Sequence, residues 1–395
     1  MTRRKNKSQA YLFILFPLLI LFSLRLSAEE VIDNDYGWSL DVPEGFKVAG
    51  YTPDGMSYQF KHDRLPVDLV MKLYPDSIYP EAIDALDGTL KKLSATTDNI
   101  DSFTWRYTNC AICQFETKIL SQKGSNGWGV SVTLPEKQTQ LVLLCYADSD
   151  KADAVQQFII STINSLCVDR GSYFCPGIIT SYGFNSKTDR KIELSINGKK
   201  IITTVKEDDA EAAQFVVDLE WSVLKLYAGN EKWKEAWQRY YKMIFRDCYG
   251  RLSRVAFDIN CALMPEAQKK NSRNPNIAMN EMLLGWVQNF DYTREQNSSD
   301  FNNLISVITG GGSDCDSRSM LLCVLMEQFG TKSTLFISDI YKHAVYGLDL
   351  DINGAKIQVG EKWFVLNETT AKGVKPGLIA QDHSETEKWI PVVLP

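Results

Sequence analysis

The sequence has few histidines and no concentration of positive charge. Only 3 of the 395 residues are histidine, and 43 lysines and arginines face 49 acidic residues, for a net charge of -6. Proteins that bind nucleic acid usually carry a basic patch or stripe. The composition therefore predicts no nucleic-acid partner. Histidines and acids at the short spacings typical of metal sites are also missing, so we expect no metal and no other cofactor.

After the first 28 residues the sequence has no apolar run of the roughly 20 residues that a membrane span needs. The beginning differs: residues 1–10 are basic and contain no acid, residues 11–24 are almost entirely apolar, and small residues stand at Ser27 and Ala28. This order predicts a secretory signal peptide, residues 1–28, cleaved after Ala28. The alternative is an uncleaved N-terminal membrane anchor. Either way we expect an exported protein, periplasmic or extracellular.

Nine cysteines in an exported chain raise the question of disulfides. Cys167 and Cys175 could close a short loop. The "CAIC" stretch, Cys110 to Cys113, has the spacing of a redox or metal pair, but a single such pair is weak evidence and we interpret it as two strand cysteines. The sequence gives no disulfide connectivity.

Residues 29–167 alternate short strand patterns, such as "MSYQFKH" and "TQLVLLCYA", with two helical patterns, the second at 151–166. This order predicts an α/β sandwich of antiparallel strands with flanking helices. The stretches "GWSLDVPEGF" and "FIISTINSL" resemble the PsbP-like α/β sandwich domains. That resemblance implies a binding or positioning module, with an envelope partner as its candidate ligand.

A glycine- and proline-containing stretch, residues 168–190, predicts a linker to a second unit, residues 191–395. That unit opens with the hairpin "KIELSINGKKIITTV", whose Asn197-Gly198 pair favours a type I′ turn. Helical patterns follow from about residue 208, and their aromatic residues at 233, 237, 240 and 241 are expected in the core. The predicted fold class for the whole chain is α+β.

The stretch "GGGSDCDSRSMLLCVLMEQFG", residues 310–330, places a cysteine between two aspartates at the start of a helix. Ser313 or Asp314 is a suitable N-cap, and the helix behind it is apolar on nearly every face, which predicts a buried helix. Cys315 then lies at the positive end of that helix, where thiolate is favoured. The two aspartates oppose this effect, so a neighbouring imidazolium is needed.

His343 begins a predicted strand, and the strand "WFVLNETT" ends near Asn367 and Glu368. A cysteine at a helix tip, a histidine at a strand start and a carboxylate or amide at a strand end is the nucleophile–base–orienter order of papain-like thiol enzymes. Successive strand side chains point to opposite faces, so Asn367 and Glu368 cannot both face His343. The charge of a carboxylate favours Glu368, with Asn367 as the alternative third member.

The segment from Asn280 to Thr370 resembles the transglutaminase-like superfamily of cysteine peptidases and acyl transferases. The matching stretches are "LLGWVQNFDY", "GSDCDSRSMLLCVLMEQFG", "HAVYGLDL" and "WFVLNETT". The resemblance implies a papain-like core, in which a helical part with the buried nucleophile helix packs on an antiparallel sheet. It also implies a catalytic triad of Cys315, His343 and Glu368. The sequence departs from the family pattern at Val345, where the family often has tryptophan.

The implied reaction is acyl transfer through a thioester, without metal or cofactor. The backbone N–H of Cys315 and the side chain of Gln288 are candidates for the oxyanion hole. We expect a peptide, protein or cell-wall peptide substrate, with hydrolysis favoured over cross-linking. The alternative function is a catalytically inactive envelope binding protein that keeps the fold. The sequence predicts no oligomeric state.

Overall fold

A computed structural model describes residues 30–134, 136–293 and 299–395. It has a mixed α and β architecture with antiparallel sheets, as the expected α+β class requires. The predicted signal peptide, residues 1–28, lies outside the described residues. Within those residues, no helix combines the length and the apolar character that crossing a membrane requires.

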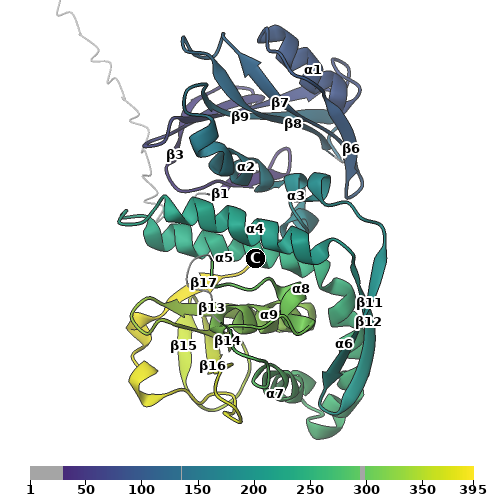
Figure 1. The fold of residues 1–395 in the computed structure, drawn as a ribbon, viewed down its shortest axis with the longest axis vertical. Coiled ribbons are helices and arrows are strands. Elements are labelled where there is room, and N and C mark those ends of the chain that lie inside the picture. The colour runs from purple at the N-terminus through teal and green to yellow at the C-terminus, as the bar shows by residue number, and fades with distance from the viewer. Residues whose placement is uncertain (1–29, 135, 294–298) are drawn as a thin grey trace, which may run out of the picture.

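A seven-stranded antiparallel sheet, in the order β3-β4-β5-β9-β8-β7-β6, forms the N-terminal unit. Its strands are β3 (Phe46–Tyr51), β4 (Ser57–His62), β5 (Val67–Pro75), β6 (Asp101–Trp105), β7 (Thr108–Thr117), β8 (Ser125–Leu134) and β9 (Thr139–Asp148). A smaller sheet joins β1 (Glu30–Asp33), β2 (Trp38–Asp41) and β10 (Leu166–Cys167). The large sheet is twisted and carries helices on both faces (Figure 1).

The central strand β9 explains why both faces of the large sheet need a helix. Leu141 and Leu143 enter the core beneath α2 (Gln156–Asn164), while Val142 and Leu144 enter the core beneath α1 (Ala82–Lys92). Strand side chains alternate between faces, so an uninterrupted apolar strand must be covered twice. The sandwich with flanking helices expected from the sequence is therefore what this part of the chain forms.

The "CAIC" cysteines lie on β7 and point to opposite faces of this sheet. Cys110 belongs to the core on the α2 side and Cys113 to the core on the α1 side. Burial raises the pKa of the Cys110 thiol to about 12 and that of Cys113 to about 11. They are two structural strand cysteines. All nine cysteines of the chain lie within the described residues and are unpaired, including Cys167 and Cys175.

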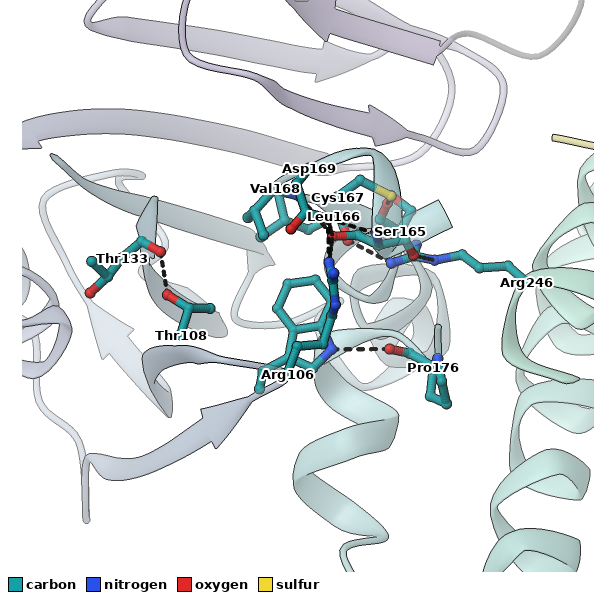
Figure 2. A network of polar contacts seen from close by, with 12 residues as sticks. Arg106, Thr108, Thr133, Ser165, Leu166, Cys167, Val168, Asp169, Pro176 and Arg246 are labelled. Carbon is teal, nitrogen blue, oxygen red and sulfur yellow. Dashed lines mark hydrogen bonds and ion pairs between the residues drawn. The ribbon is translucent and has the colours of Figure 1, made fainter. Parts of the chain in front are cut away.

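The stretch 168–190, expected as a linker, contains packed structure. It holds the 3-10 helix η2 (Arg170–Phe174) and the short helix α3 (Ile178–Gly183). The buried guanidinium of Arg246 donates hydrogen bonds to three carbonyl oxygens around it: Asn164 (3.1 Å), Leu166 (2.7 Å) and Ser172 (2.9 Å). Figure 2 shows Arg246 extending from its helix to this segment. The passage between the two units is therefore fixed to the helices of the second one.

The second unit begins with the hairpin β11 (Asp189–Ile196) and β12 (Lys199–Lys206). Asn197 and Gly198 form its turn with φ values of 50° and 75°, the positive values that a type I′ turn requires. The described residues after it form the helices α4 (Asp209–Lys225), α5 (Trp233–Arg251), α6 (Ser253–Lys270), α7 (Pro275–Val287), α8 (Leu304–Ile308) and α9 (Cys315–Gln328).

A five-stranded antiparallel sheet, in the order β15-β16-β14-β13-β17, completes the unit. Its strands are β13 (Ser333–Ser338), β14 (His343–Leu348), β15 (Lys356–Val359), β16 (Lys362–Asn367) and β17 (Ile390–Val393). The 3-10 helices η3 (Gln381–His383) and η4 (Thr386–Lys388) precede β17. Helix α9 packs against this sheet, and its residues from Met320 to Met326 are completely buried, as its all-apolar sequence predicts.

Helices α4 and α5 lie between the sandwich and the C-terminal sheet and serve both cores (Figure 1). Leu219 and Val223 of α4 belong to the core of the sandwich, whereas Val216 and Val217 belong to the C-terminal core. The buried Arg239 on α5 forms a 2.6 Å ion pair with Glu220 on α4. The second unit, residues 191–395, therefore contributes apolar side chains to the core of the N-terminal unit.

Candidate active site

The start of helix α9 is fixed by a capping box. The Asp314 side chain accepts a hydrogen bond from the backbone N–H of Ser317 (2.9 Å), and the Asp314 N–H donates to the Ser317 hydroxyl (3.0 Å). Of the two expected N-caps, Asp314 takes the role. Gly312 has a φ of 86°, which lets the chain turn into the helix. A larger residue would not fit at this position, because its Cβ would lie 2.3 Å from the Thr293 hydroxyl. The cap places Cys315 at the first helical position.

Cys315 is buried, and its thiol is hydrogen-bonded to the next residue. Its Sγ donates a hydrogen bond to Oδ1 of Asp316 at 3.1 Å, and Tyr241 donates its hydroxyl proton to the other carboxylate oxygen of Asp316. Burial, followed by the charge and hydrogen bond of Asp316 and the charge of Asp314, raises the pKa of the Cys315 thiol well above its usual range. The two aspartates thus oppose a thiolate, as expected, and the resting group is a thiol.

Cys315 and His343 open onto the same cavity, which has a volume of about 630 Å³. It lies between the α4–α5 helices and the ends of β13 and β14. Its aromatic wall consists of Trp221, Tyr227, Trp233, Trp237, Tyr240 and Tyr241. Tyr240 and Tyr241 are buried, as expected for core residues, but Trp233 and Trp237 are only partly buried and line the cavity. These two tryptophans therefore face the site instead of being fully enclosed in the core.

His343 begins strand β14 and contacts Glu368 directly. The distance from His343 Nε2 to Glu368 Oε2 is 2.8 Å, and Thr370 donates both its N–H (2.7 Å) and its hydroxyl (2.6 Å) to Oε1 of Glu368. Burial acts to raise the pKa of Glu368, but the hydrogen bond and charge of His343 and the donors of Thr370 outweigh it and lower the pKa to about 2. An ionised carboxylate accepts only, so the ring proton of a neutral His343 lies on Nε2 and leaves Nδ1 as a base.

Asn367, the alternative third member, faces away from His343. Its Oδ1 accepts a hydrogen bond from Asn280 Nδ2 at 2.9 Å, and its Nδ2 donates to the carbonyl oxygen of Val365 at 2.8 Å. The side chain is completely buried. Because side chains alternate along the chain here, Glu368 points toward His343 and Asn367 points into the core.

Gln288, the candidate for the oxyanion hole, is not brought to the thiol. Its Nε2 donates to the carbonyl oxygens of Glu368 (2.9 Å) and Val374 (2.9 Å), and its Oε1 accepts from the N–H of Gly373 (3.0 Å). These bonds occupy both donors of the amide. Gln288 is a positioning residue for the loop that carries Glu368, in place of the expected oxyanion role.

Arg318 was not singled out from the sequence, although it is the one cation in α9 and stands just before the apolar residues from Met320 to Met326. It is buried, and its guanidinium donates to the Ser313 hydroxyl (2.8 Å) and to the carbonyl oxygens of Phe290 (2.7 Å) and Thr369 (3.3 Å). These bonds join the three segments that meet at the start of α9. A charged residue inside an apolar helix was the sequence signal for this role.

His383, which lies in the 3-10 helix η3, was also missed from the sequence. Its ring lies 5.3 Å from that of His343, measured between centroids. One ligand atom each from His343, Glu368 and His383 lie within 4.8 Å of one another. The folded chain therefore brings potential metal ligands together, although the sequence has no spacing typical of a metal site. No local pattern around His383 predicts this proximity.

No protein-family model matches the chain, and no curated protein matches it. Part of the chain resembles solved structures weakly. The cyanobacterial PsbP protein of Synechocystis sp. PCC 6803 has a TM-score of 0.30 at 12% identity, covering 37% of this chain and 95% of its own. The Ran-binding protein Mog1p of Saccharomyces cerevisiae has a TM-score of 0.28 at 13% identity, covering 36% and 95%. A Bacteroides thetaiotaomicron VPI-5482 structure has a TM-score of 0.20 at 10% identity, covering 56% and 78%.

Proposed function

We propose that the protein is a transglutaminase-like cysteine hydrolase or acyl transferase that acts on peptide amide bonds through Cys315, His343 and Glu368. One observation carries the proposal: the thiol at the tip of α9 and the imidazole at the start of β14 line one cavity, and the imidazole is bonded to an ionised carboxylate at 2.8 Å. Three segments separated in sequence supply these groups in the nucleophile–base–orienter order. The family resemblance rests on the sequence stretches alone.

The first chemical step is attack by the Cys315 sulfur on the amide carbonyl carbon. Because the resting group is a thiol bonded to Asp316, its proton moves to Nδ1 of His343 as the sulfur attacks, instead of being lost beforehand. His343 becomes an imidazolium, which Glu368 stabilises by charge and by the Nε2 hydrogen bond. The backbone N–H of Cys315, at the open start of α9, is the proposed donor to the carbonyl oxygen.

The tetrahedral intermediate then releases the amine. The proton on Nδ1 of His343 goes to the leaving nitrogen, and the carbonyl carbon remains bonded to sulfur as a thioester. Water attacks this thioester, His343 accepts a proton from the water, and the carboxylic acid leaves as the thiol reforms. An amine in place of water would give cross-linking. We favour hydrolysis, because an exported enzyme meets far more water than amine.

The cavity supports a peptide substrate rather than a small hydrophilic molecule. Its volume of about 630 Å³ is in the range of ligand pockets, and its indole and phenol rings offer apolar contact area to the acyl side of a chain. Protein, peptide and cell-wall peptide remain the candidate classes. We propose export through residues 1–28, a signal peptide or an N-terminal anchor, and an envelope-binding role for the sandwich at residues 29–167.

The alternative is an inactive envelope binding protein that keeps the fold. The observation in its favour is the hydrogen bond from the Cys315 thiol to Asp316, together with the raised pKa of that thiol. In this alternative the sandwich is the working surface, and Cys315 is one more buried cysteine. The two functions differ in whether Cys315 reacts with an electrophile delivered by a peptide.

The test is trapping with an irreversible thiol-directed peptide probe, followed by mass-spectrometric mapping of the labelled residue. Cys261 is exposed and would react with any electrophile, so the experiment uses a Cys261→Ser background. We expect labelling of Cys315 that is lost in His343→Ala. Labelling that spares Cys315, or that is unchanged in His343→Ala, favours the binding protein.

A further inference from the structure

Two of the three histidines in the sequence meet beside the proposed catalytic carboxylate. His343 begins β14, His383 ends η3, and Glu368 follows β16, so three separate segments contribute. Two imidazoles and one carboxylate form a ligand set that zinc uses in open, three-ligand sites. The ligand atoms of the three residues already lie within 4.8 Å of one another.

The His383 ring is held in place by aromatic neighbours. Its centroid is 4.8 Å from the ring of Tyr341, at an interplanar angle of 37°, and Trp389 donates its indole N–H to the carbonyl oxygen of His383 at 3.0 Å. A ring fixed on both its face and its backbone loses little freedom when a ligand binds. His383 is therefore already held beside His343 and Glu368 before any ligand binds.

The cluster opens onto a second cavity, of about 530 Å³, that does not include Cys315. His343, Glu368 and His383 all line it, and His343 also lines the cavity of the thiol. An ion and its water can enter from this side without passing the nucleophile. Lys342 and His343 line both cavities, so a ligand bound to His343 from one side changes the base available on the other.

We propose that His343, Glu368 and His383 bind a divalent transition-metal ion of the zinc type, and that the bound ion reversibly blocks the thiol chemistry by occupying Nε2 of His343. The three side chains supply two nitrogens and one oxygen, and water completes a tetrahedral shell. Metal–ligand bonds of about 2.1 Å place two tetrahedral ligands about 3.4 Å apart. The present separation of 2.8 Å between His343 Nε2 and Glu368 Oε2 must therefore widen by only about half an ångström.

The block follows from the protons of the imidazole. Without metal, the ring proton stays on Nε2, which donates a hydrogen bond to Glu368. The lone pair of Nδ1 is then free to accept the proton of Cys315. A metal ion takes the lone pair of Nε2, and the ring proton moves to Nδ1. The ring then has no free lone pair toward the thiol. Binding itself is independent of the proposed function, whereas the inhibition rests on it.

The experiment titrates Co²⁺ into the full mature chain in the Cys261→Ser background and records its visible d–d absorption. We expect tetrahedral-type bands that saturate at one equivalent, that Zn²⁺ displaces, and that persist in Cys315→Ser. His383→Gln should weaken binding by about 100-fold or more, beyond the loss typical of an outer-shell change. Asp382→Asn, the exposed neighbour, is the matched control and should bind within twofold of the parent.

A second readout follows the alkylation rate of Cys315 by the peptide probe, with and without Zn²⁺. We expect Zn²⁺ to slow alkylation at least tenfold in the parent and to have no such effect in His383→Gln. Glu368→Gln provides a second binding variant in case His383→Gln melts early in EDTA. The proposal is overturned if Co²⁺ gives no saturating spectrum, if both variants bind like the parent, or if binding is lost in Cys315→Ser. Failure of the proposed function has a different signature, which is an intact cobalt spectrum with an unreactive Cys315.

Discussion

Glu368 accepts a hydrogen bond from His343 at 2.8 Å, while Asn367, the preceding residue and the last of β16, is bonded to Asn280 in the core. The two neighbours therefore have separable roles, and mutation should separate them. Glu368→Ala should lower kcat by about 100-fold or more, because the imidazole loses both its orienter and its counter-charge. Kinetics with one peptide substrate measure this loss.

Asn367→Ala is the matched variant for that comparison. It leaves the Asn280 amide and the carbonyl of Val365 without their partner, so it should lower the free energy of unfolding by about 1–3 kcal/mol. Its kcat should remain within a few-fold of the parent. The opposite order of the two kcat values would transfer the orienting role to Asn367.

Cys315 and Cys323 lie on the same helix but differ in what their thiols can reach. Cys315 lines the cavity, whereas Cys323 is completely buried in the hydrophobic core. Cys315→Ala and His343→Ala should each abolish amide hydrolysis. Cys323→Ala should keep the activity and cost about 1–2 kcal/mol of stability, measured by denaturant titration. An inactive Cys323→Ala with a normal melting profile would contradict the assignment of the nucleophile.

Asp316 offers a test of the electrostatics around the thiol. Its charge and its hydrogen bond are, after burial, the main causes of the raised pKa of Cys315. Asp316→Asn removes the charge and keeps an oxygen that can accept from Tyr241. We expect Cys315 to be alkylated several-fold faster in this variant at pH 7, in the Cys261→Ser background. A slower rate would show that Asp316 helps to remove the thiol proton instead of retaining it.

Much of this site could be predicted from residue order, and the limits are instructive. Chain alternation predicts that only one of Asn367 and Glu368 faces the histidine, and an all-apolar helix predicts the burial of α9. Gln288 and His383 show where such reasoning ends. The carbonyl groups that the Gln288 amide contacts, and the proximity of His383 to His343, depend on how separate segments pack. No local sequence periodicity indicates that packing.

The interface between the units shows the same limit. Glycine and proline in residues 168–190 indicated a linker, because they are typical of loops. No sequence pattern indicated that Arg246, in the later helix α5, would donate hydrogen bonds to the Ser172 carbonyl in this stretch and to those of Asn164 and Leu166 just before it. Long-range partners of backbone groups are set by tertiary packing.

Arg246→Ala should loosen this passage. Three buried carbonyl oxygens lose their charged donor, so we expect about 3 kcal/mol of destabilisation or more. Limited proteolysis should then cut within residues 168–190 in the variant, while the parent resists. Lys242→Ala, on the same helix and only partly buried, is the control and should behave like the parent. Equal cleavage of parent and Arg246→Ala would show that the arginine does not hold this segment.

A buried carboxyl group in the sandwich should make stability depend on pH. Glu44 is 3% exposed, and neither of its carboxyl oxygens has a hydrogen-bond partner among the described residues. Burial raises its pKa to about 8, against the opposing charge of Arg239. The folded chain therefore holds a proton on Glu44 at neutral pH, whereas the unfolded chain, with a pKa near 4.5, has lost it.

The sign of the effect follows from this difference. Below pH 4.5 both states carry the proton, and the group contributes no penalty. As the pH rises from about 4.5 to about 8, the unfolded state binds fewer protons than the folded state, so the free energy of unfolding falls. Above about pH 8 the penalty is complete. It amounts to a few kcal/mol, since each unit of pKa difference is worth about 1.4 kcal/mol.

Glu44→Gln removes the titration and keeps the shape of the side chain. Denaturant titrations at pH 5.5 and pH 8.5 should show that the parent loses stability between the two values and that Glu44→Gln loses much less. Glu207→Gln, at an exposed position, should keep the slope of the parent. A parent and a Glu44→Gln variant with the same slope would show that Glu44 is ionised in the folded chain. The carboxylate would then have to be stabilised by Arg239, and Glu44→Gln should lower the stability at both pH values.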